Sequence, residues 1–153
     1  MELVEVRSKR SMLPLQNHGM DPTHAEGPVA VIDFRTDAAV VLAVAFGLSI
    51  AYEAYRVTVK AGVSRHDTPR GFVQQLPLYV AAAVVIGLLL VGPAWSAWIG
   101  LAFSIGMIVV SIAYYHPRIM LERKPALVDW AEDLLFTGLL FVAAAQLWYA
   151  LAH

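Results

Sequence analysis

Four long apolar stretches make up most of this chain, and most of its charged residues lie between them. The stretches cover residues 38–57, 76–92, 94–115 and 134–152, and the helix that holds the last one is expected to cover residues 126–152. Each approaches the ~20 apolar residues that a helix needs to cross a hydrocarbon core of roughly 30 Å. Within lipid, every backbone N–H and C=O must be bonded inside its own segment, so such a stretch must be helical. The sequence therefore predicts an all-α fold: a polytopic membrane protein built as a bundle of four transmembrane helices.

The composition supports this fold class and narrows the function. Hydrophobic residues make up 59% of the chain and charged residues 15%, against ~45–50% and ~25% in a soluble domain. The excess apolar surface must face lipid or partner subunits. A net charge of −1 argues against a nucleic-acid partner. The chain has no Cys, which excludes thiol catalysis and iron–sulfur ligation, and we expect no cofactor.

The chain divides into a tail and one membrane domain. Residues 1–36 contain several prolines and scattered polar residues, so we expect a flexible N-terminal tail. Residues 37–153 form the transmembrane domain. We expect Asp37 to cap the first helix and the second helix to begin near Pro77. The short Gly92-Pro93 turn predicts that the second and third helices form a tight antiparallel hairpin.

Basic residues predict the orientation of the chain. They concentrate around the first and third loops and are absent from the turn at Gly92 and from the C-terminal end. Because positive residues stay in the cytoplasm, these two loops are expected to be cytoplasmic and both termini outside, in a plasma or inner membrane. Preference for Arg over Lys, with abundant Ala and Val, suggests a bacterial source. The basic residues are Arg56, Lys60, Arg65, Arg70, Arg118, Arg123 and Lys124.

Small residues recur at spacings of four along three of the expected helices. This spacing places them on one helix face, where small side chains let two helices approach closely. We therefore expect these positions to pack against other helices. They are Gly47 and Ala51, Ala83 and Gly87, and Ser96, Gly100 and Ser104.

Carboxylates at the start of the fourth helix form the sharpest cluster. Asp129, Glu132 and Asp133 lie three or four residues apart, so Asp129 shares a helix face with both others. They suit a cation site, a proton relay or a hard metal ion. They also suit the positive end of the helix dipole. Arg118, Arg123 and Lys124 in the third loop could pair with them or form a lipid-headgroup site.

Three further polar residues lie in or beside the apolar stretches. Glu53 could pair with Arg56 at i+3 or handle cations, since a charge in a membrane helix is costly. His116 has no metal-ligand motif around it, and we interpret it as an interfacial histidine rather than a haem or metal ligand. Gln146 is expected to bond to another helix.

Three functions remain open from these residues. The preferred hypothesis is a non-catalytic accessory, assembly or scaffold subunit that associates with other membrane subunits or with itself. The second is a small oligomeric transporter or channel for an ion or solute, using Glu53 and the turn of Asp129, Glu132 and Asp133. The third is a membrane enzyme acting on lipid headgroups. The first two include no catalytic residue.

Overall fold

The computed structural model describes residues 33–62, 67–121 and 125–153, and these ranges are all-helical, with no strand among them. The helices are α1 (Phe34–Val59), α2 (Pro69–Val91), α3 (Ser96–Val110), the π-helix η1 (Ser111–Met120) and α4 (Leu127–Ala152). With η1 continuing α3, four helices are long and apolar enough to cross a membrane. They indicate a multi-pass membrane protein. Most of the expected tail, residues 1–32, lies outside the described ranges.

Helix α1 begins earlier than the sequence predicted, and a different residue caps it. The Asp33 carboxylate accepts hydrogen bonds from the Arg35 N–H at 3.2 Å and from the Thr36 hydroxyl at 2.6 Å. The Thr36 hydrogen bond, opposed by partial desolvation, lowers the pKa of Asp33 below its usual value. Asp37, the expected cap, lies inside the first turn instead. An acidic residue is favourable there too, because it faces the positive end of the dipole.

Helix α2 also begins earlier than expected. Thr68 caps it by accepting a 3.1 Å hydrogen bond from the Gly71 N–H, and Pro69 occupies the first turn. The expected first residue, Pro77, lies inside the helix. Apolar length marks only the part of a helix that suits lipid, so the polar first turns of α2 were missed. After α1 the chain turns at Gly62, whose φ of 80° favours glycine.

The third helix passes beyond residue 115, the predicted end of the third stretch. It continues as η1, with Pro117 inside it, to Met120. Proline has no N–H to donate and its ring clashes with the carbonyl four residues earlier. A π-helix bonds five residues back and so changes the spacing of the turn, an adjustment that recurs at functional sites. Residues 116–120 therefore remain in a helix that continues α3.

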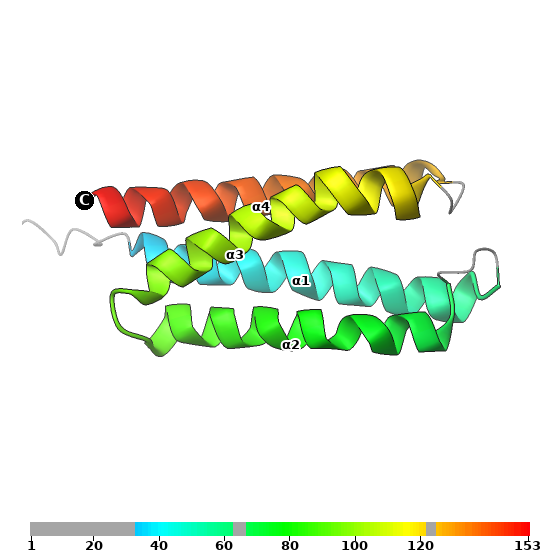
Figure 1. Cartoon of the computed structure of the whole chain (residues 1–153), viewed down its shortest axis with the longest axis horizontal. Helices are drawn as coiled ribbons and strands as arrows, with labels where there is room; N and C mark the ends of the chain where they lie inside the picture. Colours follow the sequence, from blue (N-terminus) through cyan, green and yellow to red (C-terminus); the bar gives the residue numbers. More distant parts are fainter. Residues whose placement is uncertain (1–32, 63–66, 122–124) are drawn as a thin grey trace, which may run out of the picture. The chain divides into compact units, whose positions relative to one another are not determined.

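The helices are packed around α1, which contacts both α2 and α4 extensively. Figure 1 shows α3 leaving the end of α2, crossing α1 and running on beside α4. In agreement, α3 contacts α4 more extensively than α2. The expected tight hairpin of the second and third helices is therefore not confirmed. Instead, α3 and η1 diverge from α2 along their length.

Two sets of contacts close one end of the bundle. The Arg35 guanidinium donates to the Gly92 carbonyl at 2.9 Å, and the Phe34 and Tyr149 rings lie 4.5 Å apart. The start of α1, the turn after α2 and the end of α4 therefore meet at this end. The apolar core runs from here toward the middle, and its fully buried members include Ala38, Leu42, Leu89, Leu140 and Leu147.

Candidate functional site

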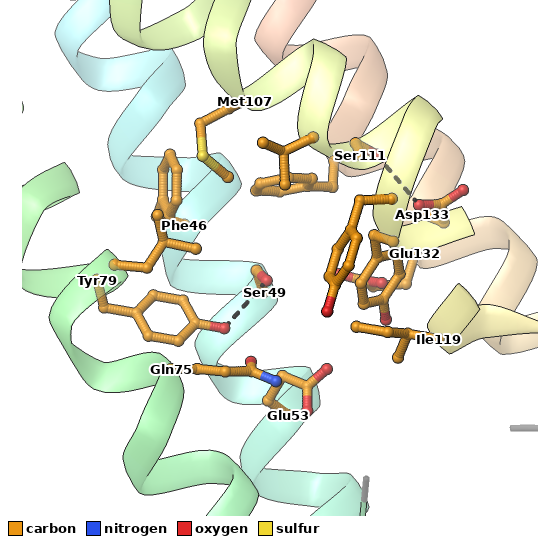
Figure 2. Close-up of a pocket in the computed structure, with 15 residues that line it drawn as sticks. Phe46, Ser49, Glu53, Gln75, Tyr79, Met107, Ser111, Ile119, Glu132 and Asp133 are labelled. Atoms are coloured by element: carbon orange, nitrogen blue, oxygen red, sulfur yellow. Dashed lines mark hydrogen bonds between the residues drawn. The ribbon is translucent and has the colours of Figure 1, made fainter. Parts of the chain in front are cut away.

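A cavity of about 190 Å³ lies in the other half of the bundle, where η1 has diverged from α2 (Figure 2). All four membrane-length helices contribute to its wall. Rings and carboxylates dominate the lining, with few small polar groups. The lining residues are Phe46, Ser49, Glu53, Gln75, Leu78, Tyr79, Met107, Val110, Ser111, Tyr114, Tyr115, Ile119, Glu132, Asp133 and Phe136.

One face of α1 supplies the floor of the cavity. Phe46, Ser49 and Glu53 follow the i, i+3, i+7 spacing of a single helix face. The Phe46 ring packs against Tyr79, with ring centroids 6.3 Å apart, and against Phe136 at 5.3 Å. The Ser49 hydroxyl lies 3.3 Å from the Tyr79 hydroxyl. The apolar core therefore ends at Phe46, and polar side chains begin one turn further along.

Three carboxylates reach the cavity from two helices. Glu53 of α1 is only 4% exposed, while Glu132 and Asp133 of α4 are partly buried. Figure 2 shows Glu53 beside Gln75 at one end of the cavity, with Glu132 and Asp133 on the wall opposite Phe46 and Tyr79. Glu53 and two of the three carboxylates of the acidic turn, which the transporter hypothesis combined, thus face one space.

Asp133 belongs to a small polar network between two hollows. Its carboxylate lies 3.1 Å from His116 Nδ1 and accepts a 3.5 Å hydrogen bond from Ser111, whose hydroxyl is 2.8 Å from that of Thr137. A second hollow, of about 210 Å³, is lined by Ser111, His116, Asp133 and Thr137 together with two apolar residues. Asp133 and Ser111 therefore form part of the wall of both spaces.

Asp129 does not join this cavity, contrary to its expected place in a carboxylate cluster. It forms part of a buried clamp around Arg56, which is 0% exposed. Arg56 donates from Nε and Nη2 to the two oxygens of Asp67 at 2.9 and 2.7 Å, and from Nη1 to Asp129 at 2.7 Å. Tyr52 also hydrogen-bonds Asp129, and Lys60 Nζ lies 3.7 Å from it.

The clamp explains why these charges are tolerated inside the bundle. Two cations, Arg56 and Lys60, face two carboxylates, Asp67 and Asp129. Asp129 also accepts a 2.6 Å hydrogen bond from the Ala126 N–H at the start of α4. A buried guanidinium is stable only when its donors are met in this way. The clamp joins the end of α1, the segment before α2 and the start of α4.

The remaining basic candidates are placed differently from the sequence expectation. Among the described residues, Asp129 pairs with cations of α1 and not with the third loop. Arg118 is exposed, and its guanidinium lies 5.7 Å from the centre of the Tyr114 ring. Arg123 and Lys124 lie outside the described residues. The headgroup site expected of these three residues therefore lies largely outside the described part of the chain.

The small residues divide into a packed set and an outward-facing set. Ser96, Gly100 and Ser104 are buried, and a Cβ on Gly100 would lie 3.0 Å from Leu89 and 3.1 Å from Leu147. In contrast, Gly47, Ala51 and Ala83 are exposed, and a Cβ on Gly47 or Gly87 would meet no atom within 4 Å. Within the part of the chain that the structure describes, close helix packing is therefore not seen at Gly47 or Gly87, and Ala51 and Ala83 are exposed. Their faces remain open.

Gln146 also departs from expectation. Its Oε1 is buried, yet it has no hydrogen-bond partner among the described residues, and the same is true of the Ser96 hydroxyl. The structure therefore shows no bond from Gln146 Oε1 across to another helix.

Sequence reasoning missed the clamp and much of the cavity wall. Asp67, Tyr52, Gln75 and Tyr79 carried no motif, and Arg56 was considered only as a partner for Glu53. One signal was present: Arg56 continues the i, i+3, i+7 face of Phe46, Ser49 and Glu53. A polar face that lengthens toward one end of an apolar helix indicates a buried polar site.

The fold and the cavity define a helical bundle with four membrane-length helices and an internal space lined by rings and carboxylates. No protein-family model matches the chain, and no match was found among curated proteins or solved structures. Its function is therefore inferred from its own residues.

Proposed function

We propose that the protein crosses a plasma or inner membrane four times, with the loops after α1 and after η1 in the cytoplasm and both termini outside. Large apolar side chains are exposed along every membrane-length helix, among them Val44, Val84, Val109 and Phe141. Lipid is the environment in which such surfaces are stable. The orientation rests on the excess of Arg and Lys in these two loops.

Exposed aromatic residues support the same placement in the bilayer. Trp95, Trp98 and Trp148 are 54–63% exposed near the turn after α2 and the end of α4. Tyr55 and Trp130 are each 42% exposed near the opposite end of the bundle. Trp and Tyr favour the two membrane–water interfaces. The two groups would mark the outer and inner interfaces.

Within this membrane protein, we propose that the cavity binds a cation as one step of its transport across the bilayer. The observation that carries this proposal is the convergence of Glu53, Glu132 and Asp133 on one space. None of the described lining residues is Lys or Arg. The nearby Arg56 donates to Asp67 and Asp129 and also interacts electrostatically with Glu53. Ionisable residues inside a membrane bundle commonly mark a path for ions or protons.

Replacement of the most buried of the three cavity carboxylates tests this function. Glu53→Gln keeps the shape of the side chain but removes its charge, so cation flux into proteoliposomes should fall at least tenfold. Asp37→Asn is the matched control, because Asp37 is an exposed carboxylate in the first turn of the same helix. Gel filtration and circular dichroism would establish that both variants fold. Unchanged flux in a folded Glu53→Gln protein would contradict the proposal.

A second function, an accessory or assembly subunit of a membrane complex, is favoured by the open faces of α1 and α2. Among the described residues, Gly47, Ala51 and Ala83 are exposed, and a Cβ on Gly47 or Gly87 would meet no atom within 4 Å. Small residues on a lipid-facing surface let a partner helix approach. Purification from native membranes in a gentle detergent tests it, because a stoichiometric set of other subunits is expected. A lone monomer would contradict this function and leave transport as the better interpretation.

A further inference from the structure

The wall of the cavity also indicates which kind of cation it takes. We propose that the occupant is a small organic ammonium ion, with alkyl groups on its nitrogen, rather than a bare metal ion. This inference rests on the proposed cation-binding function and specifies its substrate class.

The first step is the aromatic share of the lining. Phe46 of α1, Tyr79 of α2, Tyr114 and Tyr115 of η1 and Phe136 of α4 all reach the cavity. Rings therefore enter from four elements and not from one side alone. The face of an aromatic ring attracts a cation, and quaternary ammonium groups are recognised in this way. The same rings offer apolar contact to alkyl groups.

The second step is the spacing of the carboxylates. Calcium and magnesium require several oxygen ligands within about 2.0–2.6 Å of one centre. Among the described residues, no three His, Asp or Glu side chains are grouped closely enough to hold a metal ion. Glu53 lies on α1, while Glu132 and Asp133 lie on α4. Because these carboxylates lie on different walls of the cavity, they suit a larger ion whose positive charge is spread over several atoms.

The third step is size. The cavity has a volume of about 190 Å³, and a cavity of about 150 Å³ accommodates benzene. The space therefore suits a molecule of about six to ten non-hydrogen atoms, estimated from the same comparison. An ammonium ion with three or four short alkyl groups has this size, whereas a dehydrated metal ion would leave most of the cavity unfilled.

Binding of choline and its neutral isostere tests the proposal directly. The protein in lipid nanodiscs is titrated calorimetrically with choline, with 3,3-dimethylbutanol, which replaces the nitrogen with carbon, and with potassium chloride. We expect choline to bind and the neutral alcohol to bind at least tenfold more weakly. Potassium should compete poorly.

Ring variants separate a specific site from general charge attraction. Tyr79→Leu should weaken choline binding about 2- to 30-fold, the range expected for loss of one cation–π contact. Tyr79→Phe keeps the ring and should bind within about twofold of the unchanged protein, because a phenyl face still attracts cations. If Tyr79→Leu does not fold, Tyr114→Leu replaces it, since Tyr114 is 51% exposed. Tyr149→Leu, at the opposite end of the bundle, serves as the control.

The outcomes distinguish this inference from the function on which it rests. Potassium binding that depends on Glu53, without choline binding, would overturn the organic substrate class and leave cation transport standing. Equal binding of choline and the neutral alcohol, or no binding of any probe, would overturn both. Equal choline binding by folded Tyr79→Leu and Tyr79→Phe proteins would contradict the aromatic argument.

Discussion

Arg56 shows how one residue can be essential without touching the proposed ligand. Its guanidinium is fully buried and bonded on both sides by carboxylates that come from distant parts of the chain. Removing one member of a buried ion pair leaves an uncompensated charge, which costs far more than a lost surface contact. The clamp therefore holds the end of the bundle beyond the cavity and fixes where α4 begins.

Substitution of Arg56 should cause a large loss of stability. Arg56→Leu leaves Asp67 and Asp129 buried without their shared cation, so we expect the free energy of unfolding to fall by about 3–5 kcal/mol. The measurement is SDS-induced unfolding in mixed micelles. Arg118→Leu is the control, because Arg118 is exposed and its removal should cost less than about 1 kcal/mol.

A triple variant checks the cause of this loss. Adding Asp67→Asn and Asp129→Asn to Arg56→Leu removes the lone charges, and an Asn at position 129 can still accept the Ala126 N–H. Part of the lost stability should return. If the triple variant is as unstable as the sum of its three single changes, an uncompensated charge is not the reason.

At the residue scale, the sequence predicted the important carboxylates but not their partners. Glu53 and Asp133 stood out because a charge beside or inside an apolar stretch is costly. The partner of Asp129 could not be predicted, because Arg56 lies 73 residues away and the i+3 and i+4 rules cover only neighbours on the same helix. The basic residues of the third loop were therefore the natural expectation for Asp129, and of these Arg123 and Lys124 lie outside the described residues.

At the element scale, the small-residue faces differ in what they can tolerate. Gly100 faces Leu89 and Leu147 with no spare room, whereas Gly87 faces open space. Gly100→Leu should therefore overpack the interface of α3 and lower the free energy of unfolding by about 1–3 kcal/mol. Gly87→Leu should change it by less than about 0.5 kcal/mol. SDS unfolding of the two variants in parallel checks this.

The same pair bears on the second proposed function. If a partner helix covers the α2 face, Gly87→Leu should leave the unfolding of the isolated chain unchanged yet reduce the amount of partner that copurifies. Equal destabilisation by the two substitutions would mean that Gly87 is packed within the chain after all.

The four helices were predictable as elements because apolar length alone defines a membrane-length segment. The ends of these helices were harder to predict. Asp33 and Thr68 cap α1 and α2 through side-chain hydrogen bonds. Several other residues near each helix start also have side chains that can cap a helix, so the sequence did not single out the cap. The third stretch was expected to end at residue 115, but the helix continues past Pro117 as a π-helix. Apolar length alone does not predict this switch.

At the scale of the whole molecule, the proposed orientation can be measured with added cysteines, since the chain has none of its own. Ala94→Cys, in the exposed turn after α2, should react with a membrane-impermeant maleimide in intact cells. Arg70→Cys, exposed at the start of α2, should react only after permeabilisation. The opposite labelling pattern would invert the orientation, and equal labelling of both would mean that α2 does not span the membrane.

The clamp also has a consequence for how the chain is made. Arg56 is followed by Asp67 after 11 residues but by Asp129 only after 73. At roughly 5–20 residues per second, translation needs about 4–15 s to supply the second carboxylate. During this interval the guanidinium has only half of its final partners. A chain truncated before α4 would therefore lack one of the two carboxylates that neutralise Arg56.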